Sequence, residues 1–360
     1  MITTAERVDT IIDNRAAKLW MPKQVLITPA ALEEPWGQQI YERVKALGLP
    51  VLELKQNRLV NLRGADERET YRKAKNTLAI VTAPASALKL QPIPPSADYQ
   101  FHLAEGCPAH CQYCYLAGSL QGPPVIRVFA NLPAILDNLP KYKKPGQVTS
   151  FEASCYTDPL GIEHLTGSLA ETIRFFGEQE DMHLRWVTKY SQVDGLLQVP
   201  HHNNTRPRFS LNTDFISRRL EGGTASVSER LAAVRKMALP RALGGGGYKV
   251  GLVIAPIMPV PDWEEQYTHL LDNLEQALDF ACDMTFELIS HRFTPGSKAI
   301  LQEWYPNTSI DFDESNRAMK FNKFGGKKFV YKPVTMNSLR SFFYRELKRR
   351  FTYAPIFYCT

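Results

Sequence analysis

The sequence predicts an α/β protein built around a partial, TIM-like barrel of six βα units, with an N-terminal α/β cap and a C-terminal extension. Short apolar runs alternate with amphipathic helical stretches, which is typical of parallel βα units. A proline-rich segment at residues 91–96 separates this series from an earlier α/β stretch. Polar and sulfur-containing side chains follow several of the predicted strands, where parallel barrels carry their chemistry.

The cap precedes the proline-rich segment. Three short apolar runs predict its strands at residues 25–27, 50–54 and 78–81. Segment 91–96 then predicts a stiff, extended boundary. We therefore expect a cap at residues 1–95, the partial barrel at 96–305 and a basic C-terminal extension at 306–360.

Six apolar runs predict the barrel strands, at residues 99–103, 148–153, 184–188, 208–212, 249–255 and 285–289. Helices are predicted at 132–139, 165–176, 227–237 and 263–280. The last has an apolar face formed by Leu270, Leu271, Leu274 and Leu278. Six units leave the barrel incomplete, because a closed barrel of this kind has eight. In the extension we expect a short strand at 329–331, a basic helix and a terminal strand at 356–358.

The composition favours a cytoplasmic protein. At 360 residues and 44% hydrophobic, the chain can bury a sizeable core. Its N-terminus lacks the apolar core of a signal peptide, and no run approaches the ~18 apolar residues that span a bilayer. Six cysteines in so long a chain do not suggest an oxidised, secreted scaffold.

The charge is unevenly distributed. Lys and Arg number 43 against 37 Asp and Glu, and the formal net charge of +6 is compatible with a polyanionic partner. Basic residues crowd residues 320–329, where they alternate with aromatic residues, and residues 340–350. The first cluster predicts a phosphate-contacting loop, whereas a solvated helix face explains the second.

Three cysteines follow the first barrel strand at the spacing C-x3-C-x2-C: Cys107, Cys111 and Cys114. Structural zinc sites and electron-transfer cubanes use four protein ligands. Three thiolates leave one metal corner open for a substrate or cofactor. A zinc knuckle or half of a disulfide framework is the alternative, although no second Cys pair completes a tetrad.

Polar residues follow the later strands. Cys155 and Asp158 come after the second strand and Lys189 after the third, while Ser210 and Asn212 close the fourth. The carboxyl ends of parallel strands meet on one rim of a barrel, so we expect these side chains to lie close together.

The cysteine run at the start of a βα series resembles the radical S-adenosylmethionine superfamily and, within it, the spore photoproduct lyase family. The resemblance extends from Pro22 almost to the end of the chain. Its most specific stretches are residues 106–116, 151–155 with Asp158, 186–189, 208–212, 253–257, 285–289 and 291–294. It implies a radical SAM partial barrel and an enzyme that uses a [4Fe-4S] cluster and S-adenosyl-L-methionine to reverse the methylene-bridged thymine dimer in DNA.

The resemblance also implies roles for individual residues. Cys107, Cys111 and Cys114 would hold the cluster, and its open iron would chelate S-adenosylmethionine, the source of a 5′-deoxyadenosyl radical. Cys155 would give a hydrogen atom to the thymine radical, and Tyr113 and Tyr115 would relay the resulting radical. The expected cofactor-binding residues are Lys189, Asp158, Ser210, Asn212 and Thr157. The expected partners are damaged DNA and a small electron donor such as flavodoxin or ferredoxin.

Three positions depart from the family pattern. Thr157 replaces a serine and keeps a hydroxyl. Ala318 and Met319 replace an Arg-Tyr pair that contacts the lesion, so a cation and a phenol are lost, unless neighbouring Arg317 supplies the guanidinium. A radical enzyme of the same family that acts on another nucleic acid or a small molecule is therefore the main alternative. A non-catalytic iron-sulfur or nucleic-acid-binding protein would leave Cys155 and the polar rim unexplained.

Overall fold

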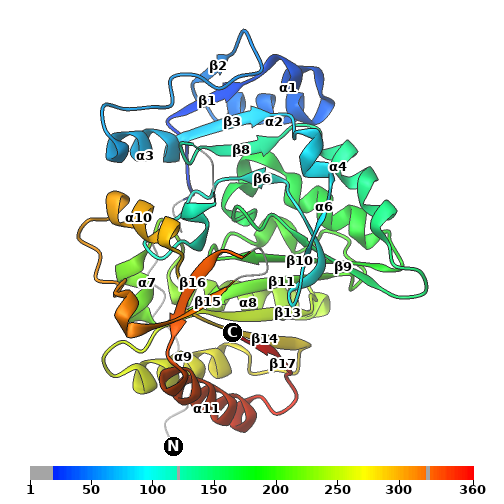
Figure 1. Cartoon of the computed structure of the whole chain (residues 1–360). Coiled ribbons are helices and arrows are strands. Elements are labelled where there is room, and N and C mark those ends of the chain that lie inside the picture. The colour runs from blue at the N-terminus through cyan, green and yellow to red at the C-terminus, as the bar shows by residue number, and fades with distance from the viewer. Residues whose placement is uncertain (1–18, 120–121, 322–324) are drawn as a thin grey trace, which may run out of the picture.

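A computed structural model describes residues 19–119, 122–321 and 325–360, and it contains two main sheets (Figure 1). The smaller sheet lies above the larger one in that view. The predicted α/β class and partial barrel are confirmed. Within these residues, no helix has both the length and the apolar character needed to cross a membrane.

The smaller sheet has the strand order β2-β1-β3-β8-β6. The three strands predicted for the cap are present as β1 (Gln24–Ile27), β2 (Val51–Glu53) and β3 (Thr77–Val81). Two more strands come from beyond residue 95, namely β8 (Ile126–Phe129) and β6 (Ala104–Glu105). The cysteine run lies between β6 and β8, so both ends of its loop are fixed to this sheet. The division into three parts stays a prediction.

The larger sheet forms the partial barrel, in the order β17-β14-β13-β11-β10-β9-β5-β4. The six predicted strands are present and pair in parallel. They are β5 (Ala97–Phe101), β9 (Thr149–Ala153), β10 (Met182–Thr188), β11 (Thr205–Leu211), β13 (Val250–Ile257) and β14 (Met284–Ser290).

Both edges of this sheet carry an added strand. The terminal strand β17 (Ile356–Cys359) pairs in parallel with β14. The proline-rich segment, predicted as a stiff, extended boundary, forms β4 (Gln91–Ile93), which pairs antiparallel with β5. Proline is tolerated there because an edge strand needs hydrogen bonds on one side only.

Helices connect the strands, largely where the sequence predicts them. They are α4 (Leu132–Asn138), α6 (Ser168–Gly177), α8 (Val227–Ala238) and α9 (Trp263–Ala277). The predicted helix at 165–176 is wrong in one respect, because α5 (Glu163–Thr166) ends before α6 begins. Gly167 separates them with a φ of +67°, and the Glu163 carboxylate caps α6 by accepting from the backbone N–H groups of Leu169 and Ala170.

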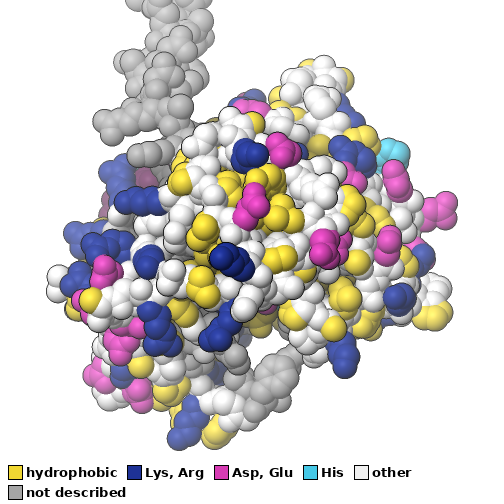
Figure 2. Space-filling view, turned by 90° about the horizontal axis from the view of Figure 1, so that it is seen from above, with side chains coloured by type: hydrophobic (Ala, Val, Ile, Leu, Met, Phe, Trp, Pro, Cys, Tyr) yellow, Lys and Arg dark blue, Asp and Glu magenta, His cyan; other side chains and the backbone are white. Residues whose placement is uncertain are grey.

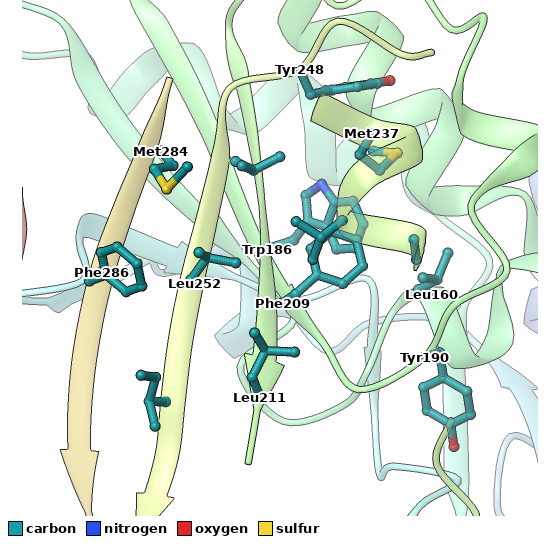
Figure 3. Packing of buried hydrophobic residues seen from close by; sticks show 14 of the residues in the cluster. Leu160, Trp186, Tyr190, Phe209, Leu211, Met237, Tyr248, Leu252, Met284 and Phe286 are labelled. Carbon is teal, nitrogen blue, oxygen red and sulfur yellow. The ribbon is translucent and has the colours of Figure 1, made fainter. Parts of the chain in front are cut away.

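Large side chains from neighbouring strands fill the core of the barrel. Trp186 on β10, Phe209 on β11, Leu252 on β13 and Phe286 on β14 are fully buried and pack against one another in one cluster (Figure 3). Truncating a buried aromatic of this size to alanine costs roughly 3–5 kcal/mol of stability. This packing fixes the strands and therefore the positions of the residues at their carboxyl ends.

After the barrel, the chain forms helix α10 (Pro295–Trp304), a hairpin and the long helix α11 (Pro333–Arg350). The hairpin consists of β15 (Arg317–Phe321) and β16 (Lys327–Tyr331), paired antiparallel. The strand predicted at 329–331 is the end of β16. The sequence did not predict β15, because its outer residues are polar or exposed.

Candidate active site

The cysteine loop is held at both ends by backbone contacts. His110 and Cys111 form β7, which pairs antiparallel with β12 (Glu221–Gly222). Gly106 opens the loop at a φ of +78°, and a Cβ there would lie 2.2 Å from the backbone oxygen of Val125. A larger residue would displace the loop, so glycine is required at this position.

Lys75, a residue that the sequence did not single out, lies beneath the loop. It is at the C-terminal end of α3 (Glu67–Lys75) and is buried. Its ammonium donates hydrogen bonds to the backbone oxygens of Cys107 and Ala109. Burial lowers the pKa of Lys75, and the nearby cysteine sulfurs oppose this by favouring the charged form. Lys75 therefore fixes the loop and brings a positive charge to it.

The three cysteines line two different cavities. One, of about 330 Å³, opens at the carboxyl ends of the barrel strands. It is lined by most of the residues predicted for the site: Cys107, Cys111, Cys114, Tyr113, Tyr115, Cys155, Thr157, Asp158, Lys189 and Ser210. The other, of about 50 Å³, lies on the side of α3 and α10. The parallel strands thus bring the predicted side chains together.

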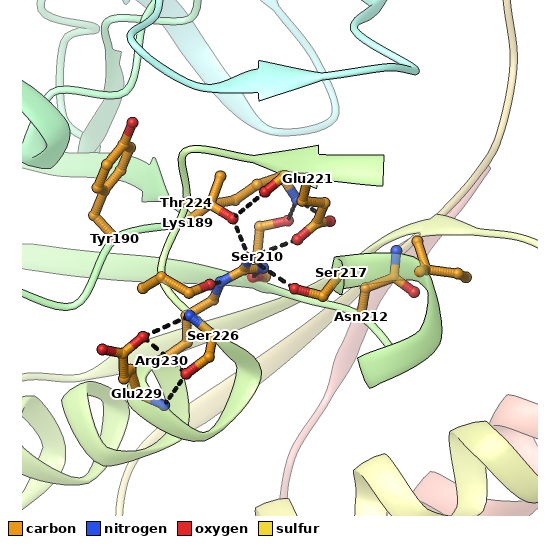
Figure 4. Close-up of polar contacts among 12 residues, drawn as sticks. Lys189, Tyr190, Ser210, Asn212, Ser217, Glu221, Thr224, Ser226, Glu229 and Arg230 are labelled. Atoms are coloured by element: carbon orange, nitrogen blue, oxygen red, sulfur yellow. Dashed lines mark hydrogen bonds and ion pairs between the residues drawn. The ribbon is translucent and has the colours of Figure 1, made fainter. Parts of the chain in front are cut away.

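Lys189 is part of a polar network at the base of the larger cavity (Figure 4). Its Nζ donates to Ser210 Oγ (2.6 Å) and lies 3.2 Å from Glu221 Oε1. The other oxygen of Glu221 accepts from Arg230 Nη2 (2.6 Å). Burial alone would raise the pKa of Glu221, but Lys189 and Arg230 hold it at about 2. One carboxylate therefore balances two cations, and neither Glu221 nor Arg230 was predicted.

Asp158 orders the end of β10. Its carboxylate accepts from Thr188 Oγ1 (2.8 Å) and from the backbone N–H of Lys189 (2.7 Å). Burial raises its pKa to about 6, although these hydrogen bonds oppose the rise. Thr157 donates to the backbone oxygen of Gly106 (2.5 Å) and so connects β9 to the cysteine loop.

Asn212 is the predicted site residue that lies apart from the cavity. It is fully buried, and its amide nitrogen donates to the backbone oxygen of Pro256 (2.9 Å). Its oxygen accepts from Tyr267 Oη (3.1 Å) and from the backbone N–H of Thr213. Both the nitrogen and the oxygen of the amide are therefore hydrogen-bonded within the protein, where Asn212 connects the end of β11 to Pro256 and Tyr267.

Cys155 follows β9 and is half-buried at the wall of the larger cavity. Burial raises the pKa of its thiol well above the usual range, and the nearby Glu152 carboxylate raises it further. Glu152 is itself paired with Arg208, which also bonds Glu287. Cys155 is therefore a protonated thiol at neutral pH, as hydrogen-atom donation requires.

The two predicted tyrosines differ in their surroundings. Tyr113 is buried and donates its hydroxyl hydrogen to Glu221. Tyr115 is half-buried, and the guanidinium of Arg292 lies 5.6 Å from its ring centroid. Arg292 also lines the larger cavity, so it places a cation at the cavity mouth that the sequence reasoning missed.

Among the residues that the structure describes, no three His, Cys, Asp or Glu side chains form a group that could hold a single metal ion. A cubane differs from a single ion because each of its thiolates binds a separate iron, so the three sulfurs need not converge on one point. All three cysteines are free thiols, and burial raises the pKa of Cys107 to about 11. Loading of iron at neutral pH must therefore release protons.

The Ala318-Met319 departure from the family pattern lies on β15 of the hairpin. Ala318 is half-buried and Met319 is exposed. Arg317 is buried, stacks on the Tyr331 ring at 3.9 Å and donates to the backbone oxygen of Asp311. These contacts use its guanidinium inside the protein, which argues against Arg317 as the substitute for the missing cation. Arg292 lies nearer the cavity.

A partial parallel barrel with three cysteines at the carboxyl ends of its strands has the architecture of the radical S-adenosylmethionine enzymes. The family model for spore photoproduct lyase matches residues 20–360. Spore photoproduct lyases of Geobacillus sp. (strain Y412MC61) and Bacillus subtilis (strain 168) are 40% and 38% identical to this chain. Both alignments cover 95% of this chain, and 100% and 99% of the respective relatives.

Solved structures agree with these relatives. A spore photoproduct lyase complexed with dinucleoside spore photoproduct matches with a TM-score of 0.88 and 38% identity, over 95% of this chain and 100% of that one. A double mutant with bound AdoMet and dinucleoside spore photoproduct matches equally well. The chain therefore belongs to the spore photoproduct lyase family, a family of radical SAM lyases.

Proposed function

We propose that this chain is a radical S-adenosylmethionine lyase that reverses the spore photoproduct in DNA to two thymines. One observation carries the proposal: the free thiol of Cys155 shares a cavity with three free cysteines at the family spacing. The match over almost the whole chain supports it, as do related structures that hold AdoMet and dinucleoside spore photoproduct.

The residues of the cavity fit the expected cofactors. Cys107, Cys111 and Cys114 would hold the [4Fe-4S] cluster and leave one iron open. With S-adenosylmethionine bound, this pair of cofactors supplies a 5′-deoxyadenosyl radical. Lys189 and Ser210 offer a cation and a hydroxyl at the cavity base for the polar parts of S-adenosylmethionine.

Cys155 completes the repair. Loss of the hydrogen atom on ring carbon six of the dimer to the 5′-deoxyadenosyl radical would allow the methylene bridge to break, and a methylene radical would remain on one thymine. The S–H bond of Cys155 is weaker than the C–H bond of the thymine methyl group, so transfer of the hydrogen atom is downhill. The S–H bond breaks, the methyl C–H bond forms, and the unpaired electron stays on sulfur. Tyr113 and Tyr115, which line the same cavity, would then relay the radical from that sulfur back to the cofactor.

The hairpin offers a surface for the DNA backbone. Lys320 and Lys328 lie directly opposite each other in the β15–β16 ladder. Like charges in that arrangement destabilise a sheet, so a bound polyanion would relieve the repulsion. The pKa of Lys328 is lowered mainly by burial and further by the nearby cation of Arg292. Lys323, within the basic segment 320–329 that the sequence predicts to contact phosphates, lies outside the described residues. The lesion would be turned out of the stack to enter the cavity.

The test uses anaerobically reconstituted protein with dithionite, S-adenosylmethionine and ultraviolet-irradiated dry DNA. We expect loss of the photoproduct and recovery of thymine, followed by mass spectrometry. Cleavage of S-adenosylmethionine without thymine recovery would favour the alternative, a radical enzyme for another substrate, which the Ala318-Met319 pair already suggests. Absence of both reactions from iron-loaded protein would contradict the proposal.

A further inference from the structure

The smaller cavity beside the cysteine loop differs from the larger one because aromatic side chains form much of its wall. Besides Cys107, Cys111 and Cys114, it is lined by Tyr71 of α3, by Trp304 and Tyr305 at the end of α10, and by Tyr156. The cysteine loop therefore separates two spaces. The larger one receives substrate under the proposed function, and the smaller one faces aromatic side chains from opposite ends of the sequence.

These aromatic residues are in mutual contact. The rings of Tyr71 and Trp304 lie 4.5 Å apart between centroids, and those of Tyr71 and Tyr305 lie 5.7 Å apart. The Tyr71 hydroxyl is also 2.9 Å from Nδ1 of His110, inside the cysteine loop. Tyr71 is buried, whereas Trp304 and Tyr305 are half-exposed. We call Tyr71, Trp304 and Tyr305 the aromatic patch. It connects the protein surface to the cysteine ligands.

Basic side chains reach the surface beside the patch. Arg68 and Arg72, near Tyr71 along α3, are exposed and Lys73 is half-exposed, whereas Lys75 of the same helix is buried. The nearby carboxylates are Glu67 and Glu69 of α3 and the exposed Glu303 of α10. Figure 2 shows Lys and Arg side chains, with Asp and Glu among them, along its left edge, the side on which Figure 1 places α3. Glu67 is near Trp304 Nε1 (3.5 Å), so one acidic group lies within the rim. An acidic protein would be attracted to this face and steered toward the patch.

We propose that the aromatic patch and the exposed arginines of α3 form the docking site of the electron donor, an acidic flavodoxin-type carrier. The inference rests on the proposed function, because that function needs a reduced cluster. A flat, half-exposed indole and phenol suit the exposed edge of a flavin ring. One electron leaves the flavin hydroquinone and reduces the cluster, and no covalent bond forms or breaks. Entry on this side leaves the larger cavity free for substrate during reduction.

The test compares two reductants of the reconstituted cluster by stopped-flow absorbance. A recombinant flavodoxin in its hydroquinone form must dock, whereas dithionite is small and needs no docking surface. We expect Arg68→Glu/Arg72→Glu to lower the second-order rate with flavodoxin roughly tenfold at low salt and to flatten its salt dependence, since steering depends on local charge. Arg340→Glu/Lys348→Glu, an exposed pair on α11 with the same change in net charge, should match the wild type.

The aromatic contribution has its own variants. We expect Trp304→Leu to slow reduction by saturating flavodoxin, Trp304→Phe to restore most of the rate, and the half-buried Trp263→Leu on α9 to have no effect. The affinity of oxidised flavodoxin, measured by titration, should fall with the arginine pair. All variants should be reduced by dithionite at the wild-type rate.

Unchanged flavodoxin rates in the arginine pair and in Trp304→Leu would overturn the inference, as would equal slowing with dithionite, which would place the defect in the cluster itself. Dependence on the patch for a ferredoxin but not for flavodoxin would overturn the choice of carrier. The proposed function fails separately, if dithionite-reduced protein releases no thymine from irradiated DNA.

Discussion

The two sides of the cysteine loop differ in how charge is treated. On the side of the larger cavity, Glu221 balances Lys189 and Arg230, so these two cations at the cavity base are paired before any ligand arrives. On the opposite side, Lys75 donates to two backbone oxygens and directs its charge at the cysteines. The difference indicates a neutralised pocket for chemistry and a positive support for an anionic cluster.

Removing any of the three cysteine ligands should remove the anionic cluster that lies between the two sides of the loop. We expect Cys107→Ala, Cys111→Ala or Cys114→Ala to lose the cluster, because three ligands are already the minimum for the open corner. Iron and sulfide analysis with absorbance spectra measures this. Cys282→Ala, at a half-buried cysteine away from the loop, is the control. A triple variant that kept a full cubane spectrum would contradict the assignment.

Glu221→Gln would break the balance on the cavity side. It leaves the buried Arg230 and the nearby Lys189 without a counter-charge, and breaking a buried pair this way costs about 3–5 kcal/mol. We expect denaturant unfolding to show a loss of that size. Glu229→Gln, at the exposed cap of α8, should change stability by less than about 1 kcal/mol. An equal loss in both variants would mean that Glu221 is not the balancing group.

Lys75→Met tests the other side. It leaves the backbone oxygens of Cys107 and Ala109 without their donor, a cost of roughly 1–3 kcal/mol for an unsatisfied buried group. We expect the variant to release cluster iron to a chelator about tenfold faster, equivalent to ~1.4 kcal/mol. Lys73→Met, two residues earlier on α3, is the matched control. If Lys75→Met released iron at the wild-type rate, Lys75 would not be needed to hold the cysteine loop.

His291 gives a contribution on the cavity side whose loss appears only as the pH falls. Burial, with Arg317 nearby, lowers its pKa to about 3. In the unfolded chain this histidine takes up its proton near pH 6.5. The contribution of His291 to the free energy of unfolding is therefore complete above that pH and decreases as the pH drops toward 3, with a slope of at most ~1.4 kcal/mol per pH unit. We expect His291→Asn to flatten the fall between pH 6 and about 4. Parallel pH profiles of the two proteins, from denaturant unfolding, would contradict this.

Local sequence patterns predicted most of the barrel, because each parallel strand is a short apolar run with turns around it. The errors arose where the partner lies far away. Segment 91–96 looks like a linker, yet β4 pairs with β5. The strand β15 has little apolar character and is defined by its ladder with β16.

The site shows the same division. The cysteines, Cys155, Lys189 and Ser210 are at strand ends, which the sequence can locate. Glu221 follows α7 (Asp214–Leu220), and Lys75 is the last residue of α3, the helix that precedes β3 of the smaller sheet. Both act through contacts with residues more than 30 positions away. No local pattern identifies such contacts, and Asn212, whose position in the sequence suggested the rim, turns inward instead.

The central claim is that Cys155 gives the final hydrogen atom to the thymine radical. It is tested most directly by a single-turnover reaction in D₂O, in which the cavity-lining thiol exchanges its proton for deuterium beforehand. We expect thymine from the wild type to carry one deuterium in its methyl group. Cys155→Ala should keep the cluster and the cleavage of S-adenosylmethionine but yield little thymine. Full yield of deuterated thymine from Cys155→Ala would contradict the claim.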